Sequence, residues 1–122
     1  MNKIVVIGSK DFNNYELLKR ELRLMLSNVD NVQLLTSDLK GTNKLIAQYS
    51  IETNTNFLNY GIDWNRFKGR APYIVNARML KDAKALIVFT DGFCKVSQNA
   101  IDIANKNDIK VHVVHFKSKN NN

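Results

Sequence analysis

Short apolar runs alternate with amphipathic segments along most of the chain. The first run, Ile4-Val5-Val6-Ile7, is continuous and β-branched, which is typical of a strand buried on both faces of a sheet. Apolar residues at helical spacing follow it, from Tyr15 to Met25. The alternation then continues: the expected strands are 32–36, 56–60, 85–89 and 111–114, and the expected helices are 41–53, a segment led by Pro72, and 96–107.

Two helix starts carry local signals. Asn13-Asn14 can supply an N-cap, and Glu16 stands three residues after Asn13, in the manner of a capping box. Pro72 suits the first turn of a helix, because its missing N–H would be unpaired there in any case. The stretch before it, 61–71, shows no period and is expected to be irregular.

The alternation of strands and helices predicts an α/β fold, a Rossmann-like three-layer domain with a mainly parallel five-stranded sheet. Right-handed crossovers favour the strand order 3-2-1-4-5. The first and fourth strands are then neighbours at a switch point, and such sheets bind ligands there, outside the carboxyl ends of the strands. We expect one domain over residues 1–116 and a disordered tail over 117–122, which has no apolar anchor.

Composition narrows the class of protein. The chain has 122 residues and one cysteine, Cys94, so it forms no intramolecular disulfide, which suits a cytoplasmic location. The apolar run near the N-terminus is too short for a signal peptide or a membrane span, so we expect no membrane partner. His112 and His115 form no ligand cluster with Cys94, so no metal and no cofactor are expected. The net charge of +7 favours anionic partners, although a solvated basic surface is the alternative.

Three polar loops are expected at the carboxyl edge of the sheet. In the first, Gly8 permits close approach of a ligand, while Ser9 and Lys10 offer a hydroxyl and a cation for a phosphate. The alternative is a plain strand-to-helix turn. The second loop carries Asp91, Gly92 and Ser97, and the third begins at Ser37; we expect these residues, too, to contact the ligand. Asp91 can accept from a ribose hydroxyl or cap a turn.

The stretch 63–70 mixes aromatic residues with three cations. Trp64 can stack on a base and Arg66 can neutralise a phosphate. A surface loop with Trp64 over the edge of the core is the alternative interpretation.

Taken in order, these motifs resemble the SLOG superfamily, and within it the small stand-alone YspA/YpsA-like domains, which are relatives of the lonely-guy phosphoribohydrolases and of the DprA Rossmann domain. The similarity covers 4–114, and its motifs are Val6-Ile7-Gly8-Ser9-Lys10-Asp11-Phe12 with Tyr15, Asp63-Trp64-Asn65-Arg66, Arg70-Ala71-Pro72 and Asn76-Ala77-Arg78-Met79. The resemblance implies the fold and a nucleotide-type pocket. It adds Asn76 and Arg78 as ligand contacts.

The chain departs from the family in two loops. The family has three glycines in the loop after the second strand, of which this chain keeps only Gly41. After the fourth strand the family has a Pro-Gly-Gly-x-Gly-Thr loop, of which this chain keeps Gly92, with Ser97 at the position of the Thr. The phosphoribohydrolase branch has a catalytic Glu shortly after that Thr, where this chain has Gln98, Asn99 and Ala100. We therefore expect no catalytic residue.

The resulting expectation is a protein that binds a nucleotide or a nucleotide-derived signalling molecule. It would act, without catalysis, as a sensor or as a sequestering, sponge-like protein in immune signalling, including phage anti-defence. Two alternatives stay open: a nucleoside monophosphate phosphoribohydrolase of the lonely-guy kind, and DprA-like binding of single-stranded nucleic acid. The resemblance also implies a homo-oligomer, with the apolar helix near Met79 as a candidate surface.

Overall fold

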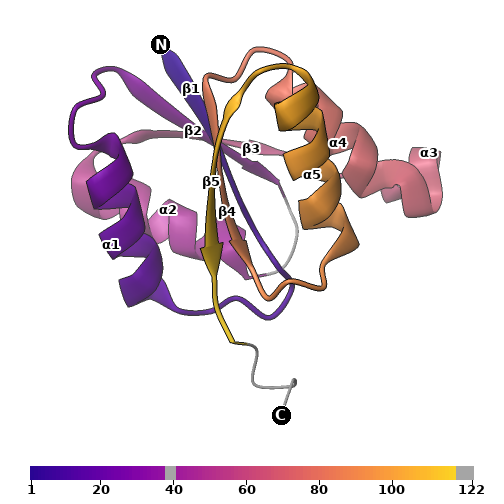
Figure 1. Ribbon diagram of the computed structural model, residues 1–122, viewed down its shortest axis with the longest axis horizontal. Helices are drawn as coiled ribbons and strands as arrows, with labels where there is room; N and C mark the ends of the chain where they lie inside the picture. Colours follow the sequence, from indigo (N-terminus) through magenta and orange to yellow (C-terminus); the bar gives the residue numbers. More distant parts are fainter. Residues whose placement is uncertain (38–40, 118–122) are drawn as a thin grey trace.

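The computed structural model describes residues 1–37 and 41–117. Five strands and five α-helices alternate along it, with one 3₁₀ turn (Figure 1). Their bounds are β1 Asn2–Gly8, α1 Tyr15–Leu26, β2 Val32–Ser37, α2 Thr42–Thr53, β3 Asn56–Tyr60, α3 Trp64–Phe67, the 3₁₀ turn Lys68–Arg70, α4 Ala71–Leu80, β4 Ala85–Thr90, α5 Lys95–Lys106 and β5 Lys110–His115. Residues 118–122 of the expected tail lie outside the described residues.

All five strands are parallel, in the order β3-β2-β1-β4-β5, which confirms the predicted topology. The register pairs Gly8 of β1 with Phe89 of β4, so the two strands end side by side. The chain winds away from this pair in both directions. The predicted switch point therefore exists, at the carboxyl ends of β1 and β4.

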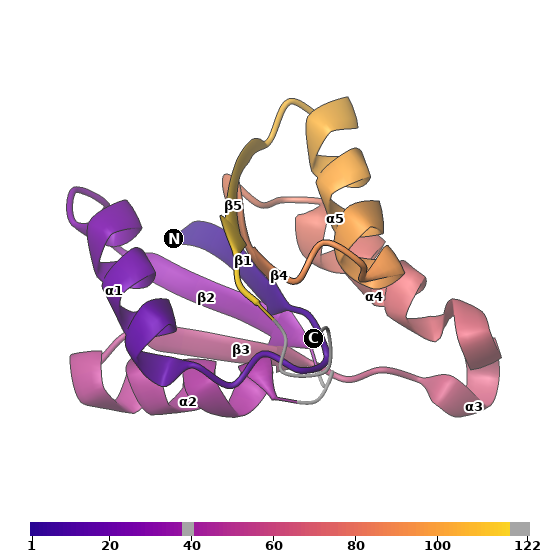
Figure 2. The same ribbon diagram turned by 60° about the horizontal axis from the view of Figure 1, so that its bottom comes forward.

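Helices cover both faces of the sheet, giving three layers (Figure 2). On one face α1 and α2 pack over Val6, Leu34 and Ile87. On the other face α4 and α5 pack over Val5, Leu35 and Val88. β1 is buried on both faces of the sheet, which explains why its apolar run is continuous, as the sequence pattern predicted.

Local details differ from the expectations at two helix starts. The N-cap of α1 is Asn14, whose side chain accepts from the backbone N–H of Leu17 at 3.0 Å. Glu16 is then the second residue of the helix, one position too early for a capping box, although a carboxylate in the first turn still suits the helix dipole. The expected irregular stretch contains α3, a single turn that Asp63 caps through the N–H of Arg66.

The apolar side of α4 belongs to the core. Met79 is 1% exposed and packs in the cluster beneath α4 and α5. Met79 itself therefore cannot contribute to a self-association surface, and the expectation that the helix near it does so stays a prediction. Within residues 1–37 and 41–117, no helix is both long and apolar enough to cross a bilayer.

Candidate functional site

A hydrogen-bond network joins the two loops at the switch point. The N–H of Ser9 donates to the carbonyl of Phe89 at 2.8 Å, and the Ser9 hydroxyl lies 3.3 Å from the Thr90 hydroxyl. Ser9 Oγ also accepts from the N–H of Asp91 at 3.3 Å. Both hydroxyls are buried, at 1% and 5% exposure. Ser9, a predicted ligand contact, thus holds the backbone of the opposite loop in this structure.

The loop between β4 and α5 is further shaped by its own side chains. Thr90 Oγ1 accepts from the N–H of Gly92 at 3.0 Å, and Asp91 Oδ1 accepts from the N–H of Phe93 at 2.9 Å. Gly92 has a positive φ of 91°, and the space beside its Cα is open. Cys94 caps α5, its Sγ accepting from the N–H of Ser97 at 3.4 Å. The result is a braced loop with an accessible backbone at Gly92.

The N-terminus of α2 is packed against the end of β1. A Cβ on Gly8 would approach the Cβ of Thr42 to 3.1 Å and overlap its hydroxyl, so glycine is needed there for the helix to come this close. Gly41, the N-cap of α2, has a φ of 96°, and a Cβ on it would lie 2.8 Å from the carbonyl oxygen of Phe12. Two glycines therefore permit this junction between α2 and the first loop.

Thr42 is the unusual residue of this junction. It is 2% exposed, and among the described residues its Oγ1 has no hydrogen-bond partner. Gly41 has no side chain to accept from the first-turn N–H groups of α2, and that turn contains no acidic residue. Leaving a buried hydroxyl unsatisfied costs about 1–3 kcal/mol. The junction thus contains a buried, unpaired hydroxyl beside a helix N-terminus, where an anion is electrostatically favoured.

The remaining predicted contacts fall into three other places. Ser37, Ser97 and Asn76 are buried at 4%, 2% and 1% exposure. The amide nitrogen of Asn76 donates to the carbonyl of Val96 at 2.9 Å and to Asn99 Oδ1 at 3.2 Å, which ties α4 to α5.

Arg78 lies near the end of β3, its guanidinium 5.9 Å from the centroid of the Tyr60 ring. Both residues line a hollow of about 310 Å³. Trp64 and Arg66 are exposed on α3, which lies at the periphery in both views, and Arg66 lies over its neighbour Phe67 (Figures 1 and 2). The structure therefore brings together Gly8, Ser9, Lys10, Asp91 and Gly92 at the switch point but not Arg78, Trp64 or Arg66.

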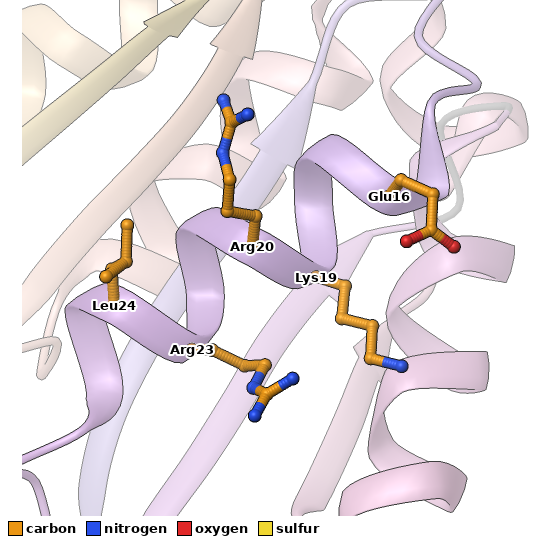
Figure 3. Close-up of a pocket in the computed structure, with 5 residues that line it drawn as sticks. All are labelled: Glu16, Lys19, Arg20, Arg23 and Leu24. Atoms are coloured by element: carbon orange, nitrogen blue, oxygen red, sulfur yellow. The ribbon is translucent and has the colours of Figure 1, made fainter.

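A hollow of about 520 Å³ lies along α1, away from the switch point. Its lining residues all come from that helix: Glu16, Lys19, Arg20, Arg23 and Leu24. In Figure 3, Arg20 and Leu24 point to one side of the helix, and Lys19 and Arg23 point to the other. Because these side chains diverge, they do not converge on a small ligand.

Two tyrosines with raised pKa values lie away from the switch point. Burial raises the pKa of Tyr49, and burial together with a hydrogen bond to Glu52 raises the pKa of Tyr15; both tyrosines pack at the α1–α2 face. Asp91 is used as a turn acceptor. Within 1–37 and 41–117, no three His, Cys, Asp or Glu side chains cluster closely enough to hold a metal ion.

Two residues that sequence reasoning did not select stand out at this edge. Thr42 follows a glycine at a helix start, but only its packing against Gly8 reveals that its hydroxyl is buried and unpaired. Phe93 is 78% exposed on the braced loop, whereas Phe12 and Phe89 are buried and stack on each other. The available sequence signal was an aromatic residue next to a glycine in a predicted loop.

No protein-family model matches this chain, and no curated protein is similar enough in sequence to match it. The resemblance to the SLOG superfamily therefore continues to depend on the motifs quoted above and on their place in the fold.

Proposed function

We propose that this chain is a SLOG-like protein that binds a nucleotide or a nucleotide-derived signalling molecule at the carboxyl edge of β1 and β4. The observation that carries the proposal is the unpaired, buried hydroxyl of Thr42 at the N-terminus of α2, packed against Gly8. A phosphate oxygen can accept from that hydroxyl and from first-turn N–H groups together.

Charge and exposure at the same edge support an anionic ligand. Lys10 is exposed on the loop that follows β1, and the net charge of the chain is +7. An exposed lysine provides a cation that can pair with a phosphate without first breaking an internal contact. Gly92, on the facing loop, offers an open backbone for the rest of the ligand.

Binding without catalysis is the favoured form of this function. Cleavage of an N-glycosidic bond requires a positioned acid or base. The carboxylate of Asp91 already accepts from the N–H of Phe93, and Ser9 is occupied by the opposite loop. A protein that binds a nucleotide signal without cleaving it would act as a sensor or as a sequestering protein. A sponge-like protein of phage anti-defence is one example of the second role. We propose that the chain works as a homo-oligomer.

The first test identifies the ligand. Native mass spectrometry of the purified protein should reveal a bound nucleotide, and a panel of mononucleotides and cyclic or ADP-ribose-type nucleotides should then be titrated by calorimetry. An empty protein that binds nothing in the panel would remove the proposal. Release of adenine from AMP would favour the phosphoribohydrolase alternative, and a salt-dependent shift of a labelled oligonucleotide without nucleotide binding would favour the DprA-like one.

The second test uses a matched pair of variants on α2. Thr42→Val removes the unpaired hydroxyl at the N-terminus, while Ser50→Ala removes the other unpaired, buried hydroxyl of the same helix, near its C-terminus. We expect Thr42→Val to weaken nucleotide binding by about 10- to 150-fold, the effect of one hydrogen bond to a charged group. Ser50→Ala should leave the affinity unchanged, and equal effects of the two variants would contradict the site.

A further inference from the structure

A cavity adjoins the switch-point loop that follows β4. It has a volume of about 260 Å³ and lies where β4 and β5 end against α5. Figure 1 shows α5 beside these two strands. Gly92, the open glycine of the switch-point loop, forms part of its wall. The cavity is therefore continuous with the loop that the proposed ligand would meet.

The walls of this cavity are of two kinds. Ile101 of α5 and Val113 of β5 supply apolar surface, and both are partly buried. Gln98, His115 and Cys94 supply polar atoms. The exposed side chain of Gln98 donates through its amide nitrogen to Asp102 Oδ1 at 2.9 Å, so its carbonyl oxygen is the group that it can offer a ligand. Apolar walls with a few fixed polar groups are the usual lining of a site for a small organic molecule.

Size restricts what the cavity can hold. Pockets that enclose a whole drug-sized molecule measure roughly 300–1,000 Å³. This cavity is smaller, so it suits one ring system and not a complete nucleotide. A bare phosphate is a poor match, because Ile101 and Val113 would face an ion that needs hydrogen-bond donors.

Distance along the sheet links the cavity to the junction at Gly8 and Thr42. The strand order puts β4 between β1 and β5, so the ends of β1 and β5 are two strand spacings apart, about 10 Å. That separation is on the scale of a nucleotide. Phe93, 78% exposed and next to Gly92 and Cys94 in sequence, adds an aromatic face to the same loop.

We infer that this cavity is the base subsite: it receives the heterocyclic base of the nucleotide whose phosphate lies at Thr42. The inference rests on the proposed function, and it adds the location at which the base binds. The apolar walls cover the ring faces, and the Gln98 carbonyl oxygen meets a polar edge of the base.

Cys94 makes the inference directly testable, because it is the single cysteine of the chain and lines the cavity. Its alkylation by N-ethylmaleimide should be followed by mass spectrometry in the presence of AMP, GMP, CMP or UMP, and of ribose 5-phosphate, each at a concentration shown by calorimetry to saturate. At least one mononucleotide should slow the labelling by about tenfold or more, the protection given by occupancy of roughly nine sites in ten. Ribose 5-phosphate, which has the phosphate without the base, should not slow it.

The outcomes separate the two proposals. Mononucleotides that bind without protecting Cys94, or equal protection by ribose 5-phosphate, would overturn the base subsite while leaving anion binding at Thr42 intact. Absence of binding by all of these probes and by the cyclic and ADP-ribose-type nucleotides of the panel would overturn both.

A pair of glutamine variants gives an independent check. Gln98→Ala changes the cavity wall, and Gln48→Ala makes the same change at an exposed position of α2 on the opposite face of the sheet. We expect Gln98→Ala to weaken binding of the protecting mononucleotide by about fivefold or more, with ribose 5-phosphate affected less than about twofold. Equal losses for both ligands, or no loss for either, would contradict the assignment.

Discussion

Replacing Gly8 with alanine tests the packing that brings α2 against β1. The new methyl group would lie 3.1 Å from the Cβ of Thr42 and 3.2 Å from its Cγ2, and it would overlap the hydroxyl oxygen. Rotation of the Thr42 side chain cannot remove the overlap fully, because the Cβ stays in place and a β-branched residue in a helix has few rotamers. Thr42 is the first residue of α2, so relief requires the helix itself to move.

The expected penalty follows from these contacts. Overpacking by one methyl group costs typically 1–3 kcal/mol, and we expect Gly8→Ala to lower the free energy of unfolding by about 2 kcal/mol. For a domain of this size that corresponds to a fall in Tm of roughly 6–10 °C. Urea denaturation followed by circular dichroism measures the free energy, and a thermal scan gives Tm.

A double-mutant cycle isolates the cause. Thr42→Ala removes the two atoms beyond Cβ, so the Gly8→Ala penalty should be smaller by about 1–2 kcal/mol in that background. Gly69→Ala is the control, because no atom lies within 4 Å of the added methyl group and φ there is not positive. A Gly8→Ala protein as stable as the wild type, or a penalty that persists unchanged in the Thr42→Ala background, would refute this account of the junction.

Three further predictions concern the framework around the site. Asn14→Ala should lower the free energy of unfolding by about 0.5–2 kcal/mol in urea melts, because it removes the N-cap of α1. Asn13→Ala should change that free energy little. A larger effect of Asn13→Ala would show that Asn13 is the N-cap. Asn76→Ala should cost about 1–3 kcal/mol in the same assay, because it removes a buried side chain and leaves the partly buried carbonyl of Val96 without its α4 partner. A neutral result would show that the α4–α5 contact does not need it. Burial raises the pKa of Tyr49, so the folded state holds that proton more tightly than the unfolded state and stability falls as pH rises above about 10. Tyr49→Phe should reduce this alkaline loss in urea melts at pH 9 to 11 and leave the part due to Tyr15, whose pKa is also raised; an unchanged slope would contradict the assignment.

The strands and their order were predictable because β1 and β4 are continuous apolar runs that only a doubly covered sheet can bury. The cap of α1 was missed by one residue. Asn13 and Asn14 have the same capping chemistry, and the choice between them depends on the turn that the Phe12 N–H closes onto the carbonyl of Ser9, at 2.9 Å. A single helical turn such as α3 is too short to show a period, although Asp63 caps it.

The candidate site was predictable only at the level of its loops. The sequence predicts Gly8, Ser9 and Gly92 as groups that face a ligand, and Gly8 and Ser9 prove to hold structure as well. These roles come from tertiary contacts: Gly8 packs against α2, and Ser9 bonds to the facing loop. The direction of Arg78 likewise depends on how α4 sits on the sheet, which turns it toward Tyr60.

The bond between the Ser9 and Thr90 hydroxyls joins residues 81 positions apart. Contacts of such long sequence separation form late in folding, since the loop between them must first be closed. A partly synthesised chain that ends before β4 lacks the facing loop, and it cannot hold a ligand that needs both loops. Ligand binding would then report completion of the whole fold: bound nucleotide should slow hydrogen exchange throughout the sheet wherever exchange needs global unfolding, because a ligand that binds only the folded state lowers the population of unfolded molecules.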